Sequence, residues 1–151
     1  MKSLTVTAIN QAWDWTGIEA AEVIRTNAFG NVLFLTVAND YWRICPEELR
    51  CEGVAADRIE LSDLLADPEF ALNREMSKLV EAATAKLGDL REGQAICLRV
   101  PAVLGGSYEN ENLAVLPLRE LLAVSGDLAW QINDLPEGQR VRLTVRKPPK
   151  P

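Results

Sequence analysis

Three β-like runs separated by very short turns place the strongest constraint on the fold of this chain. The runs span Glu22–Ala28, Asn31–Ala38 and Tyr41–Cys45, and the pairs Phe29-Gly30 and Asn39-Asp40 separate them. Connections this short join antiparallel neighbours, so the pattern predicts an antiparallel meander. Pro46 ends the third run because proline cannot donate to a strand ladder. The next segment, Glu48–Val54, is expected to add a fourth strand or an irregular return.

Two further segments have the apolar periodicity of amphipathic helices. The first is predicted to begin with Asp67 as N-cap and Pro68 at the first helical position, and to end at Gly88. The second is opened by Pro117 and has an apolar face formed by Leu118, Leu121, Leu122, Ala129 and Ile132. Weaker helical patterns cover Ser3–Trp15, where Thr5-Val6-Thr7 favours a strand, and Ile59–Ala66.

A short sequence motif follows the first long helix and is repeated near the C-terminus. Leu90–Val100 and Leu135–Val145 each place a Glu-Gly-Gln turn before an alternating strand, and a short strand over Leu113–Leu116 lies between the two copies. The flanks of the copies differ, so the pattern indicates one connection used twice and not a repeat protein. Because strands occur in runs and do not alternate with helices, we expect an α+β fold, a mostly antiparallel sheet with an N-terminal meander and two main helices packed on it.

Length and composition indicate one domain over residues 1–145 and a disordered, basic, proline-rich tail over 146–151. The N-terminus lacks the apolar stretch of a signal peptide, and no apolar run approaches the length of a membrane span, so a cytoplasmic protein with no membrane partner is expected. The chain has no histidine, which excludes Ser-His and Cys-His nucleophile pairs. We predict neither catalytic residues nor a cofactor nor a metal site. Whether Cys45 and Cys51 ever pair is left open.

The most unusual segment is the loop Pro101–Leu113, in which Gly105-Gly106 precedes a polar, acidic, aromatic-bearing run. A phosphate-binding loop needs a lysine and a helix directly after its glycines, and neither is present here. We therefore expect Gly105, Gly106 and Asn112 to be structural loop residues that turn one strand into the next. The loop would present Tyr108, Glu109 and Glu111 to solvent.

Net charge and aromatic residues together suggest a protein partner. The formal charge is −6, which repels phosphate backbones and argues against direct nucleic-acid binding. Such a surface suits a basic protein, although acidity also simply aids solubility. Tyrosine and tryptophan are frequent interface anchors. We therefore single out five candidate partner-binding residues: Tyr41, Trp42, Tyr108, Glu109 and Glu111.

The chain resembles the C-terminal domain family of immunity proteins that neutralise DNase toxins of type VI secretion. Five motifs in the same order carry the resemblance, with the loop Leu104–Tyr108 and its closing Glu111-Asn112-Leu113 as the strongest signature. The others are Ala12–Trp15, Asn27–Val32, Tyr41–Ile44 and Trp130–Gly138. They span nearly the whole chain, from Gln11 to Val145. The toxin-linked members carry an additional N-terminal domain, which we do not expect in this chain.

The resemblance implies a non-enzymatic, immunity-type protein that binds and neutralises a cognate bacterial toxin, with a nuclease effector as one such partner. Complementary charge would favour a basic toxin. Two alternatives from other classes remain open: a general interaction or adaptor domain without a toxin partner, and a small-molecule binder or cryptic hydrolase. A buried carboxylate with a shifted pKa in a deep pocket would support the last of these. Homo-oligomer formation also stays open.

Overall fold

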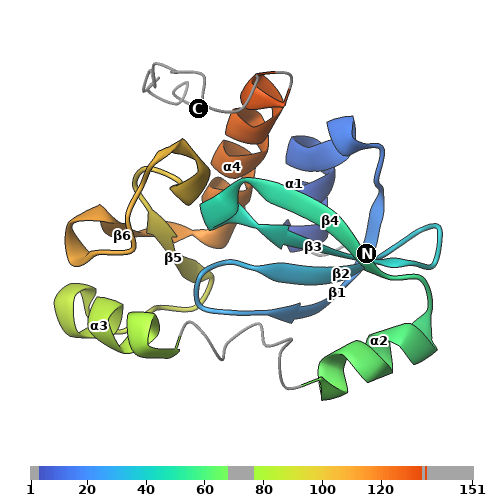
Figure 1. Ribbon diagram of the computed structural model, residues 1–151, viewed down its shortest axis with the longest axis horizontal. Helices are drawn as coiled ribbons and strands as arrows, with labels where there is room; N and C mark the ends of the chain where they lie inside the picture. The colour runs from blue at the N-terminus through green and yellow to red at the C-terminus, as the bar shows by residue number, and fades with distance from the viewer. Residues whose placement is uncertain (1–3, 68–76, 134, 136–151) are drawn as a thin grey trace.

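The meander expected near the N-terminus is present in the structure, a computed structural model that describes residues 4–67, 77–133 and 135. Its strands are β1 (Ala20–Thr26), β2 (Val32–Thr36), β3 (Tyr41–Cys45) and β4 (Arg50–Ala55), all antiparallel and in the spatial order β1-β2-β3-β4. A short 3-10 turn, η2 (Pro46–Glu48), leads from β3 into β4. The fourth run is thus a strand of the sheet (Figure 1).

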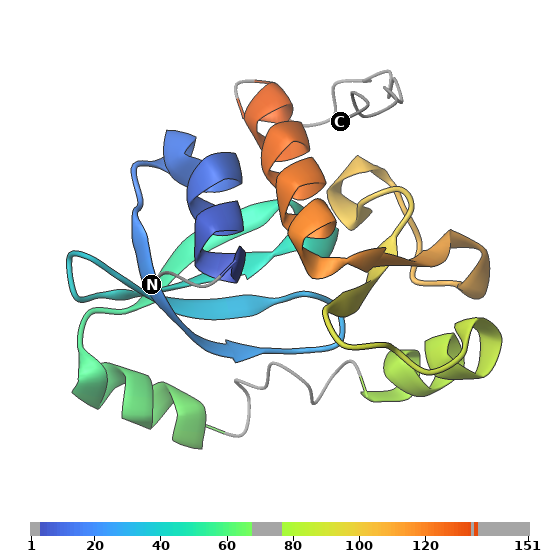
Figure 2. The same ribbon diagram turned by 180° about the vertical axis from the view of Figure 1, so that it is seen from behind.

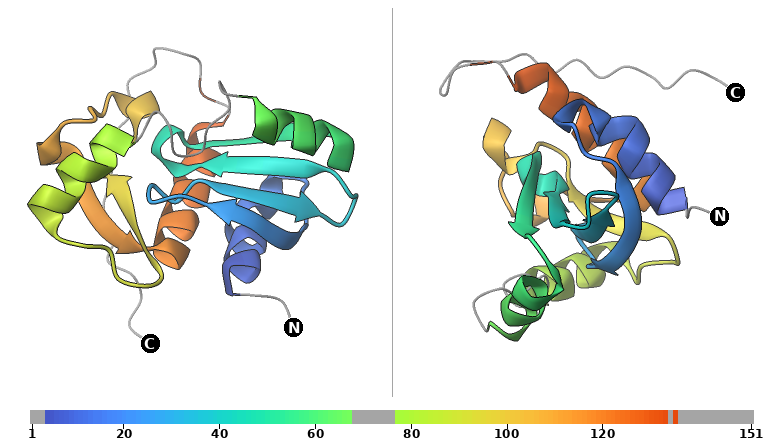
Figure 3. Two further views of the ribbon diagram at one scale, coloured as in Figure 1. Left: turned by 90° about the horizontal axis from the view of Figure 1, so that it is seen from below. Right: turned by 90° about the vertical axis from the view of Figure 1, so that its right-hand side faces the viewer.

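Both faces of this sheet are covered, because β2 alternates apolar side chains toward each face. Val32 and Phe34 pack with residues of α1 (Leu4–Trp13) and α4 (Leu118–Ile132). Leu33 packs on the other face with Leu61 of α2 (Arg58–Ala66). α1 and α4 lie side by side on one face of the sheet, and α2 lies on the opposite side (Figures 2 and 3).

The α1–α4 contact depends on a glycine at the point of closest approach. A Cβ atom added at Gly126 would lie 2.4 Å from the backbone oxygen of Ala12 and 2.8 Å from its Cβ. Glycine costs about 1 kcal/mol relative to alanine in a helix interior. Here that cost is offset because the small residue lets α4 bury its apolar face, including Leu122 and Ala129, against α1.

A second, smaller sheet stands beside the meander. It consists of β5 (Gln94–Leu98) and β6 (Leu113–Pro117), paired antiparallel. Its apolar residues Ile96 and Leu98 pack with Ala83 of α3 (Ser77–Leu87) and with Phe29 from the first meander turn. The backbone N–H of Ile96 donates to the carbonyl of Ala28 at 2.7 Å, which joins the small sheet to that turn.

The α+β class is confirmed, and the structure adds two features of the arrangement that the sequence does not specify. The strands form two sheets, and the backbone bond from Ile96 to Ala28 joins β5 to the β1–β2 turn without extending a strand ladder. The helix beside α4 is α1, whose buried residues Val6, Ile9 and Trp13 belong to the same apolar cluster as Leu122 and Ala129 of α4.

Asp67 marks a helix end in the described structure. It is the C-cap of α2, and its N–H donates to the carbonyl of Leu64, whereas Asp57 is the N-cap whose carboxylate accepts from the N–H of Glu60 at 2.8 Å. Three predicted features lie outside the described residues: the helix start at 68–76, the second copy of the repeated motif beyond Leu135, and the C-terminal tail. Within the described ranges, no helix has the length and apolar character needed to cross a membrane.

Candidate functional site

The glycine loop between β5 and β6 is held by the side chain of Asn112. Its amide nitrogen donates to the carbonyls of Val100 at 2.9 Å and Ser107 at 2.7 Å, while its Oδ1 accepts from the N–H of Val100 at 2.9 Å. Gly105 has a φ of +94°, in the left-handed region that favours glycine. Gly106 packs so tightly that an added Cβ would lie 1.7 Å from the oxygen of Val100.

The three predicted partner residues of this loop differ in accessibility. Glu109 and Glu111 are exposed. Tyr108 is half-buried and packs against the cluster that contains Phe29, Ile96 and Leu113. Burial, followed by the nearby negative charges of Glu47 and Glu48, raises the pKa of Tyr108 to about 12, so the phenol is neutral near pH 7.

Tyr41 and Trp42 do not share a surface with Tyr108. They are successive residues of β3 and therefore point to opposite faces of the meander. Tyr41 is only 6% exposed and packs with Leu33 and Leu61. Trp42 is half-buried and belongs to the cluster on the α1–α4 face, and a Cβ added at Gly53 would lie 3.5 Å from its ring. The predicted aromatic anchors are thus spread over three packing clusters.

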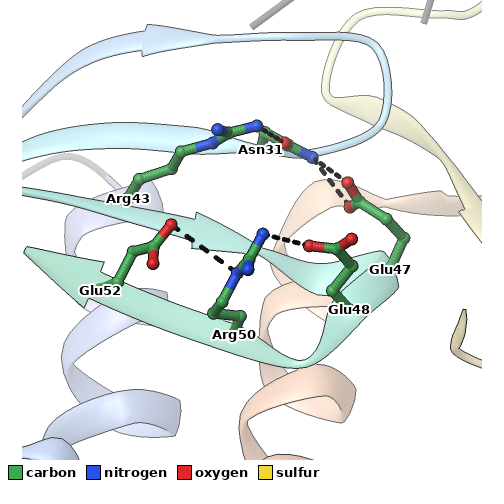
Figure 4. A network of polar contacts seen from close by, with 6 residues as sticks. All are labelled: Asn31, Arg43, Glu47, Glu48, Arg50 and Glu52. Carbon is green, nitrogen blue, oxygen red and sulfur yellow. Dashed lines mark hydrogen bonds and ion pairs between the residues drawn. The ribbon is translucent and has the colours of Figure 1, made fainter. Parts of the chain in front are cut away.

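A buried carboxylate, which the sequence does not reveal, lies at the turn between β3 and β4. Glu47 is 4% exposed, and both of its carboxylate oxygens accept from the amide of Asn31, at 3.0 and 2.8 Å. The amide oxygen of Asn31 in turn accepts from Arg43 at 2.8 Å, so the three side chains form a relay (Figure 4). The neighbouring Glu48 pairs with Arg50 on the surface.

Burial raises the pKa of Glu47 above its ordinary value of 4.5, although the bond from Asn31 lowers it. The nearby charge of Glu48 also raises this pKa, whereas Arg43 lowers it. Since the folded state holds the proton more tightly than the unfolded chain, protonation of Glu47 favours folding. This contribution is fully present below about pH 4.5 and is lost as the pH rises through the raised folded pKa.

We therefore predict that Glu47→Gln flattens the pH dependence of stability. The natural chain should lose free energy of unfolding relative to the variant as the pH rises from about 5 toward neutrality, with a limiting slope of about 1.4 kcal/mol per pH unit for one proton. Urea unfolding of both proteins across this range measures the difference. Parallel curves would show that Glu47 titrates alike in the folded and unfolded chains.

An aromatic, acidic groove lies between α1 and α4, on residues that the sequence patterns did not mark as a site. A groove of about 620 Å³ is lined there by both helices. Trp15 and Trp130 lie along it and are 37% and 57% exposed. The indole nitrogen of Trp15 donates to the carbonyl of Gly126 at 3.2 Å, and its ring stacks on buried Trp13 with centroids 6.0 Å apart.

Three charged residues also line this groove: Asp14, Asp127 and Arg119. Asp127 accepts from Gln131 at 2.8 Å, which orients its carboxylate on the surface of α4. Of the two neighbouring tryptophans Trp13 and Trp15, the first is buried and the second is partly exposed. The exposure of Trp130 depends on the rotation of α4, which its packing on α1 sets, so periodicity alone would not have found the groove.

The described residues offer little for metal or thiol chemistry. They contain no group of three or more His, Cys, Asp or Glu side chains placed to hold a metal ion. Cys45, Cys51 and Cys97 are free thiols. Burial raises the pKa of Cys45 to about 11 and that of Cys51 to about 12, so both are protonated at neutral pH and weakly nucleophilic.

Comparison with known proteins tests the suspected family directly. Residues 55–129 match the family model described as T6SS immunity protein Tdi1, C-terminal. The family resemblance is confirmed over these residues. No curated protein matches the chain.

The match to the immunity-protein family covers about half of the chain, from the last residue of β4 into α4. It includes the glycine loop, the strongest of the five motifs, whereas the three motifs before residue 55 and the one that starts at Trp130 lie outside it. The matched segment supports a toxin-neutralising role. It also contributes most of α4 and so one wall of the α1–α4 groove.

Proposed function

We propose that this chain is a non-enzymatic immunity-type protein that neutralises a cognate bacterial toxin by binding a basic part of it in the α1–α4 groove. The family match supports the immunity role. The observation that carries the choice of surface is the pair of exposed tryptophans, Trp15 and Trp130, beside two carboxylates in one groove. A nuclease effector is the kind of toxin that this surface suits best, because nucleases present cations to bind phosphate.

The rings in the groove are suited to anchoring a partner. Tryptophan is among the residues that contribute most to protein interfaces, since it buries a large area with little loss of side-chain entropy. Trp15 is already fixed by its bond to Gly126 and its stacking on Trp13, so binding would cost little further ordering. Trp130 has more than half of its surface free for contact.

The charges along the groove favour a partner with a basic surface. Asp14 and Asp127 outnumber Arg119 along the groove, and the whole chain carries a net charge of −6. An arginine or lysine of the toxin could therefore pair with a carboxylate while it lies over an indole face, which adds a cation–π contact. Complementary charge would also speed the encounter with a basic toxin.

The test is neutralisation of a candidate toxin, namely the protein encoded beside the gene of this chain. Its production alone should stop growth of a bacterial host, and co-production of this chain should restore growth. The purified proteins should form a complex, and the toxin should lose its activity when the two are mixed. An unrelated toxin of the same class should stay active, which controls for general effects on the host.

Two results would contradict the proposal. One is a neighbouring protein that is not toxic, and the other is a toxin that remains active in the presence of this chain. A stable complex without any change in toxicity would instead indicate the adaptor alternative.

A further inference from the structure

A second cavity lies on the other side of α4 from the groove. It has a volume of about 400 Å³ and is bounded by α4, the β5–β6 sheet and η2. Its wall is mostly apolar and includes the following side chains, of which the last two belong to α4: Phe29, Leu49, Leu98, Leu116, Leu121 and Leu128. Different residues of α4 line the groove and the cavity, so the helix separates the two.

Two polar side chains in the wall of this cavity are themselves almost completely buried, and both offer acceptors. Glu47 is one, and its carboxylate is hydrogen-bonded by the neutral amide of Asn31. Ser125, which is 2% exposed, is the other. Its hydroxyl proton is engaged by the α4 carbonyls of Leu121 at 2.7 Å and Leu122 at 3.2 Å, which leaves the oxygen only lone pairs.

The donors and charges around Glu47 compensate the burial of its carboxylate only in part. The charge of Glu47 is accordingly disfavoured by its surroundings, as its raised pKa shows. The charge of Arg43, which donates to the amide oxygen of Asn31, lowers the pKa of Glu47 by less than burial raises it. Arg99, the cation in the cavity wall, is an exposed residue. A ligand with several N–H donors and a positive charge would add hydrogen bonds and a further positive charge at the carboxylate of Glu47.

We propose that this cavity binds a small molecule with an apolar body and a protonated primary amine, whose ammonium group hydrogen-bonds to the carboxylate of Glu47. The apolar wall accepts the body of the ligand, and the ammonium group provides three donors for the acceptors of Glu47 and Ser125. This site is independent of toxin binding, because its residues and those of the α1–α4 groove lie on different faces of α4.

Three probes of similar shape test the proposal on the natural chain: 2-phenylethylamine, 2-phenylethanol and 3-phenylpropanoate. Isothermal titration calorimetry at pH 7 should show that the amine binds at least tenfold more tightly than the alcohol, since a charge-assisted bond is worth more than a neutral one. The carboxylate probe should bind most weakly, because Glu47 repels it. Equal or tighter binding of the acid, or no binding of the amine, would overturn the proposal.

Two variants then locate the site. Glu47→Gln keeps the size of the side chain and should reduce affinity for the amine at least tenfold while leaving the alcohol unchanged. Val124→Trp places a large ring at a cavity residue that is 50% exposed, so the new side chain has room in solvent, and it should weaken all probes. If circular dichroism shows that Glu47→Gln does not fold, the site is tested by Val124→Trp together with the relative affinities of the three probes. Amine binding that neither folded variant weakens would overturn the proposal.

Discussion

Replacement of Gly106 by alanine is expected to destabilise the protein by about 3 kcal/mol or more, a large effect for a single added methyl group. The added Cβ would lie 1.7 Å from the oxygen and 2.6 Å from the carbonyl carbon of Val100. These are backbone atoms, and the oxygen is also bonded to the amide of Asn112. The loop would have to break that bond or move away from β5 to relieve the overlap.

Gly105→Ala is the matched control. Gly105 has open space around its Cβ position but a φ of +94°, so alanine there meets backbone strain without a collision. We expect a cost of about 1 kcal/mol, typical of a non-glycine residue in the left-handed region. Thermal unfolding should then show a lowering of Tm of about 6–12 °C for Gly106→Ala and of about 2–4 °C for Gly105→Ala. Equal effects of the two changes would contradict this account of the loop.

Removal of the Trp130 ring is expected to have the largest effect on toxin binding. If the α1–α4 groove is the docking surface, Trp130→Ala should weaken the complex by about 2 kcal/mol or more, roughly 30-fold in Kd. Because the ring is 57% exposed, the stability of the free protein should change by less than about 0.5 kcal/mol. Surface plasmon resonance or calorimetry with the purified toxin measures the loss, and urea unfolding measures the stability.

Two further variants make this result specific. Ile59→Ala removes another exposed apolar side chain, on α2 and away from the groove, and should leave affinity unchanged. A Glu109→Gln, Glu111→Gln double variant neutralises the glycine loop, the surface that the sequence patterns favour. If this double variant weakens binding and Trp130→Ala does not, the toxin docks on the loop and the groove proposal is wrong. The immunity function itself would still stand.

The residues near the glycine loop show how far sequence reasoning reaches. The pair Gly105-Gly106 and the closing Asn112 stand out in the sequence because few other residues suit such a turn. Their different physical roles do not appear there, since Gly106 faces Val100, which precedes it in the chain and meets it only after the loop closes. Likewise, the sequence marks Tyr108 as an aromatic loop residue, whereas its half-burial follows from packing against Phe29 and Ile96.

The burial of Glu47 and the exposure of Trp130, on which the two proposals rest, cannot be predicted from the sequence. Glu47 occurs in a Pro-Glu-Glu turn that resembles any exposed acidic turn, and only the folded chain brings Asn31 within 3.0 Å of it. Trp130 lies near the apolar stripe of α4 in the sequence, and such a position predicts core packing. The contact of Gly126 with Ala12 sets the rotation of α4, and at that rotation Trp130 points into the groove and toward solvent.

The local order of this protein follows from its sequence alone. Short turns between β-branched runs predict the meander, apolar periodicity predicts α4, and the glycine loop indicates the family, because these signals act between neighbours in the chain. Tertiary packing was needed to establish that the strands form two sheets, that α1 lies against α4, and that the groove and the Glu47 cavity lie on different faces of α4. The physical reason is that these features depend on which distant apolar faces bury one another, and local periodicity does not specify that choice.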